Sequence, residues 1–114
     1  MGGAKLKPSG KFELLWMVLR GPKLTPEFKF DSKRRFRFDF YVESNGLKVA
    51  VELEGGVWSK GRHTRPSGFL RDMEKYNLAA SKGILVFRIP SHDISAKWIS
   101  PIVKTINERT PNAR

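Results

Sequence analysis

The sequence predicts an α/β (α+β) fold in which helices flank a mixed β-sheet, in the order helix, three-stranded meander, helix, strand and C-terminal helix. Three observations predict this fold class. Asn45-Gly46 stands between two runs of alternating apolar and polar residues, apolar residues recur at helical spacing over residues 11–20 and 67–81, and residues 84–89 form a short apolar run. A chain of 114 residues is long enough for a single domain with one modest core.

The first predicted helix spans residues 11–20, with Ser9 as its cap, after a flexible segment at residues 1–10. Its apolar stripe has i, i+3, i+4, i+7 spacing: Phe12, Leu15, Trp16 and Leu19. Glu13 lies beside this stripe and has two interpretations. A solvated glutamate on the helix surface is the favoured one, and an auxiliary ligand for a metal ion or water above the sheet is the alternative.

A meander follows, with a short strand at residues 27–30, a turn, and a long strand from about Arg34 to the Asn45-Gly46 turn. Asn-Gly is the preferred pair for a two-residue type I′ turn, which fixes the register of the hairpin. On one face the predicted pairs are apolar: Val42–Val49, Phe40–Val51 and Phe38–Leu53. The other face pairs Glu43–Lys48, Tyr41–Ala50, Asp39–Glu52 and Arg37–Glu54.

Three carboxylates therefore converge on the second face of this hairpin. Asp39 and Glu52 are directly opposed, with Cβ atoms roughly 5 Å apart, and like charges so placed are destabilising. Glu54 lies one pleat further along the same face. A hard divalent cation with oxygen ligands is the simplest reason for this arrangement, so Asp39 and Glu52 are the predicted metal ligands.

The second predicted helix spans residues 67–81 and ends at Gly83. Its predicted inner stripe consists of Phe69, Leu70, Met73, Tyr76, Asn77 and Ala80. Lys75 either belongs to an exposed charged face or, if the helix crosses the polar side of the hairpin, reaches the carboxylates. A buried strand at residues 84–89, a helical turn near residues 93–98 and a C-terminal helix at residues 100–109 follow. Ser100 would cap that last helix and Pro101 would begin it, with Ile102, Val103 and Ile106 docking it.

The formal net charge of +11 and the pI near 10.4 predict a polyanionic partner, usually a nucleic acid. Cations interleaved with aromatic residues suit phosphate contacts at two places, although solubility would also explain them. The first place is the start of the long strand, with the candidates Arg34, Arg35 and Arg37. The second is a glycine-rich loop, with the candidates Trp58, Lys60, Arg62, His63 and Arg65. A lone loop histidine such as His63 is more often a solvated side chain.

Several classes of protein are excluded by composition. The chain has no cysteine, so disulfides and thiolate metal sites are absent. It also contains no apolar stretch of membrane-spanning length and no signal-peptide core, so we expect a cytoplasmic protein that does not bind membranes.

The element order and the motif Asp39…Glu52-Leu53-Glu54 resemble the PD-(D/E)XK nuclease superfamily, whose restriction-endonuclease-like core is α-β-β-β-α-β. The resemblance covers about residues 10–90 and points to the small single-domain branch akin to very-short-patch repair endonucleases and phage nuclease-like proteins. It is carried by three segments: Val51-Glu52-Leu53-Glu54-Gly55-Gly56, Asp72-Met73-Glu74-Lys75-Tyr76-Asn77 and Gly83-Ile84-Leu85-Val86-Phe87-Arg88.

The resemblance implies a DNA endonuclease, involved for example in DNA repair, in which Asp39 and Glu52 bind Mg²⁺ and Mn²⁺ can substitute. Phe38 precedes Asp39 where the family often has proline. Glu54 stands where the family usually has lysine, as in some restriction endonucleases, and would act as the general base or bind a second metal ion. Lys75 or Lys60 would then supply the missing cation, and Arg37 would partly neutralise Glu54.

Two alternatives stay open at this point. The carboxylates could be balanced by neighbouring cations in a non-catalytic, basic nucleic-acid-binding domain, or the chain could be an RNA-binding structural protein, which explains the charge but not the acidic face. A single small domain usually nicks one strand, whereas cleavage of both strands usually needs two copies, so a homodimer is also an open alternative.

Overall fold

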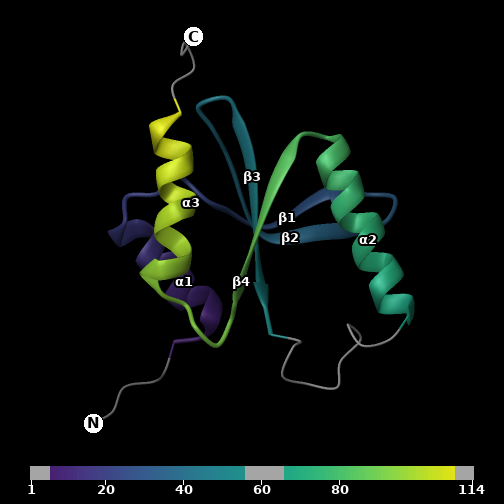
Figure 1. Ribbon diagram of the computed structural model, residues 1–114, viewed down its shortest axis with the longest axis horizontal. Helices are drawn as coiled ribbons and strands as arrows, with labels where there is room; N and C mark the ends of the chain where they lie inside the picture. The colour runs from purple at the N-terminus through teal and green to yellow at the C-terminus, as the bar shows by residue number, and fades with distance from the viewer. Residues whose placement is uncertain (1–5, 56–65, 110–114) are drawn as a thin grey trace.

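The computed structural model describes residues 6–55 and 66–109 of the chain. Its elements are α1 (Pro8–Val18), β1 (Thr25–Asp31), β2 (Phe36–Ser44), β3 (Leu47–Glu54), α2 (Pro66–Ser81), β4 (Ile84–Pro90) and α3 (Ala96–Glu108). The sheet order is β1-β2-β3-β4; neighbouring strands are antiparallel except β3 and β4, which run parallel. Figure 1 shows α1 and α3 on one side of this sheet and α2 on the other. The predicted α/β (α+β) class, a mixed sheet flanked by helices, is confirmed.

The β2–β3 hairpin has the predicted turn and, close to the turn, the predicted register. Asn45 and Gly46 both have positive φ, 51° and 79°, as a type I′ turn requires. The pairs from Ser44–Leu47 to Phe40–Val51 form as predicted. Beyond them the prediction is wrong: the ladder ends at Phe40–Val51, and the pairs Phe38–Leu53, Asp39–Glu52 and Arg37–Glu54 do not form.

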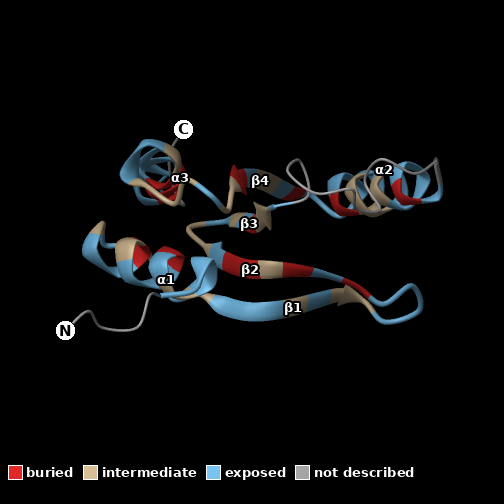
Figure 2. Cartoon of the chain, turned by 90° about the horizontal axis from the view of Figure 1, so that it is seen from below, coloured by how far each residue is buried: buried red, intermediate tan, exposed pale blue. Residues whose placement is uncertain are grey.

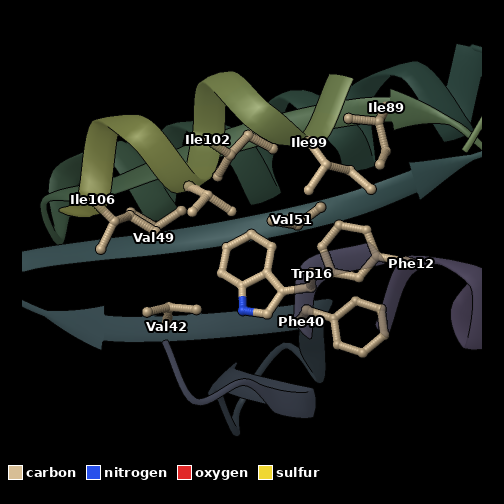
Figure 3. Close-up of a cluster of buried hydrophobic side chains, with 11 residues drawn as sticks. Phe12, Trp16, Phe40, Val42, Val49, Val51, Ile89, Ile99, Ile102 and Ile106 are labelled. Atoms are coloured by element: carbon tan, nitrogen blue, oxygen red, sulfur yellow. The ribbon is translucent and has the colours of Figure 1, made fainter. Parts of the chain in front are cut away.

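The main hydrophobic core lies between the sheet and the two helices α1 and α3. Figure 3 shows ten of its side chains converging from α1, β2, β3, β4 and α3: Phe12, Trp16, Phe40, Val42, Val49, Val51, Ile89, Ile99, Ile102 and Ile106. Each such side chain, when fully buried, contributes about 1.5–3 kcal/mol to the hydrophobic driving force for folding. This core fixes the position of β3 and therefore of the residues at its C-terminal end.

A smaller cluster lies on the other face, under α2, where Phe38, Tyr41, Ala50, Ala79 and Ile84 are buried. The predicted inner stripe of α2 is wrong for all its members except Tyr76. Phe69, Leu70 and Met73 are more than half exposed, and Asn77 and Ala80 are exposed too. The inward side of α2 instead carries small and polar residues, and it meets a sheet face on which two partly buried glutamates, Glu52 and Glu54, need hydrogen-bond donors.

The helix boundaries differ from the predictions at two places. α1 begins at Pro8, so Ser9 lies inside the helix and is not its cap, and residues 8–10 are not part of a flexible segment. The end of the predicted turn at residues 93–98 and the predicted helix at residues 100–109 belong to one helix, α3, which begins at Ala96 after the N-cap Ser95 and contains Pro101, so Ser100 is not its cap. Because Ile99 continues the buried stripe of Ile102 and Ile106, packing on the sheet outweighs the backbone hydrogen bond that Pro101 cannot make.

Figure 2 shows the layers edge-on, with the strands stacked from β1 at one edge to β4 at the other. Among the described residues, no helix is long and apolar enough to cross a membrane.

Candidate active site

The candidate site lies where β2 and β3 separate. In a two-residue hairpin the hydrogen-bonded pairs recur at every second residue from the turn, so Leu53 N–H would donate to the Phe38 carbonyl in a regular ladder. Leu53 N–H instead donates to Asp39 Oδ2, at 2.7 Å. The Asp39 side chain thus replaces the next ladder bond, and it occupies the gap that opens between the two strands.

Glu52 precedes Leu53 on β3 and is the most strongly held carboxylate of the site. Lys75 Nζ lies 2.5 Å from Glu52 Oε2, and the hydroxyl of Tyr76 donates to Oε1 at 3.1 Å. The side chains of Glu52 and Lys75 are only 17% and 13% exposed. Burial raises the pKa of the Glu52 carboxyl above its ordinary value, and this effect outweighs the opposing influence of Lys75 and Tyr76.

Glu54 lies one pleat further along β3 and has different partners. Its Oε2 accepts a hydrogen bond from Arg88 Nε at 3.0 Å and one from the Tyr76 hydroxyl at 3.2 Å. The predicted partner, Arg37, instead forms an ion pair with Glu27. The single hydroxyl proton of Tyr76 is therefore shared between Glu52 and Glu54. Burial, together with these two carboxylates, raises the pKa of the Tyr76 phenol far above its ordinary value.

A cleft of about 280 Å³ opens over this part of the sheet. Its walls come from the start of β2, the end of β3 and the inward side of α2, and they are formed by Arg35, Phe36, Arg37, Asp39, Glu52, Arg71, Asp72 and Lys75. Asp39 and Glu52, the predicted metal ligands, therefore line one cleft. Lys75 reaches Glu52 from α2, and contact with the carboxylates was the second of its two predicted roles.

Two cationic residues of this region were not predicted, Arg71 and Arg88. The Arg71 guanidinium lies over the Phe36 ring, 5.0 Å from its centroid, and projects into the cleft one helical turn before Lys75. The i, i+4 spacing of Arg71 with Lys75, for which contact with the carboxylates was one of two predicted roles, was a usable signal. Arg88 stands on β4 beside Glu54, and only the parallel pairing of β3 with β4 brings them together.

Of the other predicted site residues, two line the cleft, two lie away from it and the rest fall outside the described residues. Glu13 is exposed on α1, the helix on the other side of the sheet, and does not line the cleft. Arg34 forms an ion pair with Asp31 at 3.1 Å, while Arg35 and Arg37 line the cleft. The predicted nucleic-acid contacts of the glycine-rich loop fall outside the described residues: Trp58, Lys60, Arg62, His63 and Arg65.

The carboxylate pair fits one kind of metal site. Among residues 6–55 and 66–109, no three Asp, Glu or His side chains converge on a common metal-binding point. A closed protein cage, as calcium often has, is therefore not formed by these residues. Magnesium is commonly held by one or two carboxylates, with waters and substrate phosphates as its other ligands, and Asp39 with Glu52 matches that donor set.

Comparison of the chain with models of known protein families, with curated proteins and with solved structures found no significant match. The resemblance to the PD-(D/E)XK nucleases thus stays a prediction from the sequence.

Proposed function

We propose that the protein is a metal-dependent DNA endonuclease that hydrolyses phosphodiester bonds. The observation that carries this proposal is the position of Asp39 and Glu52, which come from neighbouring strands and line one cleft where those strands separate. The element order from α1 to β4 is also the α-β-β-β-α-β order of the restriction-endonuclease-like core. The net charge of +11 supports a polyanionic substrate.

In this proposal Asp39 and Glu52 hold Mg²⁺, for which Mn²⁺ can substitute. Leu53 N–H keeps Asp39 in place through one carboxylate oxygen, and the apolar core behind β3 keeps Glu52 in place. When bound, the metal ion would activate a water, polarise the scissile phosphate and stabilise the leaving 3′-oxygen.

Lys75 supplies the cation that the sequence lacks at position 54. It lies within hydrogen-bonding distance of Glu52 and lines the cleft, so it can orient a water or contact the scissile phosphate from the α2 side. Glu54 is hydrogen-bonded to Tyr76 and Arg88 and does not line the cleft, so it is better placed to orient Tyr76 than to accept a proton from the attacking water.

Three guanidinium groups surround the acidic floor of the cleft, those of Arg35, Arg37 and Arg71. Guanidinium groups bind phosphate in a bidentate manner, so these residues would hold the phosphates that flank the scissile bond. Arg71 is restrained by its contact with Phe36, which lowers the conformational entropy lost on binding.

One observation favours a second function, that of a non-catalytic nucleic-acid-binding domain. Lys75 and Tyr76 already satisfy both oxygens of Glu52, so this carboxylate is balanced without a metal ion. In that case the same cationic cleft would bind the phosphate backbone without cleaving it.

A cleavage assay on plasmid, branched and single-stranded DNA distinguishes the two functions. The wild-type chain should cleave in Mg²⁺ or Mn²⁺ and not in a chelator. Asp39→Asn and Glu52→Gln keep the side-chain shape but remove the charge. Each should lower the cleavage rate by more than the roughly 10- to 100-fold that is typical when a residue that only supports a metal ligand is replaced. Glu43→Gln, an exposed carboxylate on the same strand as Asp39, is the matched control. Cleavage that survives both cleft substitutions would overturn the proposed mechanism at Asp39 and Glu52, and DNA binding without cleavage would establish the second function.

A further inference from the structure

The two edges of the sheet differ in how they are protected against pairing with another strand. The edge strand β1 carries several features that prevent such pairing. Pro26 lacks an N–H, Glu27 has a positive φ of 53°, the exposed Lys29 adds charge, and the register shifts between Lys29 and Asp31. The edge at β1 is therefore closed to a further strand.

The edge strand β4 has almost none of these features. Ile84 to Phe87 are all apolar, and Pro90 is the last residue of the strand. Arg88 is its one charged residue, and it is held by Glu54 at 3.0 Å. Figure 2 shows β4 at the edge of the stacked strands, with α3 beside one face of the sheet and α2 beside the other. Its outer N–H and C=O groups face away from β3, so they can pair with a further strand.

An apolar groove runs beside this edge. Two adjoining hollows of about 350 and 300 Å³ share Tyr76 and Arg88 and follow the outer side of α2 along β4. Phe69 and Met73 border one of them, and Leu85 borders the other. Phe69 and Met73 are 56% and 54% exposed on the α2 side of the sheet, which is unusual for large apolar residues. Leu85 is 45% exposed at the same edge, and by strand alternation it shares the α3 side of β4 with Phe87 and Ile89.

The charge of this surface differs from that of the chain as a whole. The chain has a net charge of +11, whereas α2 carries two cations, Arg71 and Lys75, and two anions, Asp72 and Glu74, so the helix is neutral. A nucleic acid gains little from a neutral apolar groove, because its affinity comes mainly from cation–phosphate contacts. A second copy of this basic chain meets no net positive charge on this helix.

From these observations we infer that the protein forms a two-fold symmetric dimer in which β4 pairs antiparallel with β4 of a second copy. Such an isologous contact satisfies both open edges at once and joins the two sheets into one. The groove between β4 and α2 then receives apolar side chains of the other copy. Because the carboxylate cleft lies on the inward side of α2, each copy would keep its own cleft accessible, and the dimer would carry two.

Sedimentation velocity over a range of protein concentrations, on protein freed of nucleic acid, tests the dimer. We expect a reversible dimer that becomes tighter in high salt, because salt screens the repulsion between two copies of charge +11. Leu85→Lys should raise the dimer dissociation constant by about tenfold or more, since it places a charge at the paired edge. Leu14→Lys is the matched control, because Leu14 is 47% exposed on α1, away from β4, and it should leave the constant unchanged.

A second measurement, chemical cross-linking, does not require the dissociation constant of the dimer to be determined. Because the chain has no cysteine, Leu85→Cys and Leu14→Cys each introduce one thiol, and a short bismaleimide should cross-link the first variant into dimers but not the second. A wild-type chain that stays monomeric at every concentration, equal effects at Leu85 and Leu14, or an assembly that salt dissociates would overturn the inference. None of these readouts measures cleavage, so the dimer and the proposed activity can fail independently.

Discussion

The two faces of the sheet share the same strands but differ in what they bury. The face under α1 and α3 buries only apolar side chains in its core, and the ring of Phe12 stacks on that of Phe40 at 4.7 Å. The face under α2 holds Glu52, Lys75 and Tyr76, each partly buried and each hydrogen-bonded. The first arrangement favours folding. In the second arrangement, the burial of charged groups lowers the free energy of unfolding unless each group has a partner. We interpret the face under α1 and α3 as the one that stabilises the fold, and the face under α2 as the one that carries the proposed chemistry.

The largest effect should come from the apolar face. Ile102→Ala removes a fully buried side chain of α3 and should lower the free energy of unfolding by about 2–5 kcal/mol, because the cavity can be filled only partly. Equilibrium unfolding in urea measures this change. Leu14→Ala, on the exposed side of α1, is the control and should cost less than about 0.5 kcal/mol. Equal losses of unfolding free energy in Ile102→Ala and Leu14→Ala would contradict the assignment of the stabilising core to this face.

A smaller effect on the free energy of unfolding should come from the face under α2, and a second substitution should reverse most of it. Lys75→Met leaves Glu52 without its cation in a half-buried position, and it should lower the free energy of unfolding by about 1–3 kcal/mol. The double variant Glu52→Gln with Lys75→Met removes both charges and should regain most of that loss, because neutral replacements of a buried ion pair are often tolerated. If urea unfolding shows that the double variant is the least stable, the ion pair serves folding rather than chemistry.

The smallest effect concerns acid stability at the start of α3. Trp98 Nε1 donates to Asp93 Oδ2 at 2.9 Å, and this bond lowers the pKa of the Asp93 carboxyl below its ordinary value of 3.8. A lowered pKa in the folded state means that the contribution is present above pH 3.8 and is lost as the pH falls through the folded-state pKa. Asp93→Asn should therefore reduce thermal stability slightly at neutral pH and not in strong acid. A difference that is independent of pH would contradict this assignment.

The turn, the first pairs of the hairpin and the apolar core could be predicted from the sequence, because each depends on local rules. Asn45-Gly46 selects a type I′ turn, and the alternation around it sets the register as far as Phe40 and Val51. The end of the ladder could not be predicted in this way. It depends on a side chain, that of Asp39, taking the N–H of Leu53, and such competition with the backbone leaves no periodic signal.

The orientation of α2 was predicted wrongly for a related reason. Phe69, Leu70 and Met73 have the spacing of an inner stripe, yet they are exposed, while Lys75 and Tyr76 face the sheet. Periodicity assumes that the covered surface is apolar, but the surface under α2 carries Glu52 and Glu54. The predicted carboxylates Asp39 and Glu52 line one cleft. Arg71 was missed although its i, i+4 spacing with Lys75 was a usable signal, whereas Arg88 was missed because only the pairing of β3 with β4 brings it beside Glu54.

We propose that the carboxylates of the two separating strands hold one divalent cation. Paramagnetic Mn²⁺, titrated at substoichiometric amounts into isotope-labelled protein, broadens the NMR signals of amides near its binding site. We predict that the amides of Asp39, Glu52 and Leu53 broaden first, that Glu43→Gln leaves this pattern intact, and that Asp39→Asn abolishes it. Broadening centred on other acidic residues such as Glu27 and Asp31, or unchanged by Asp39→Asn, would contradict the claim.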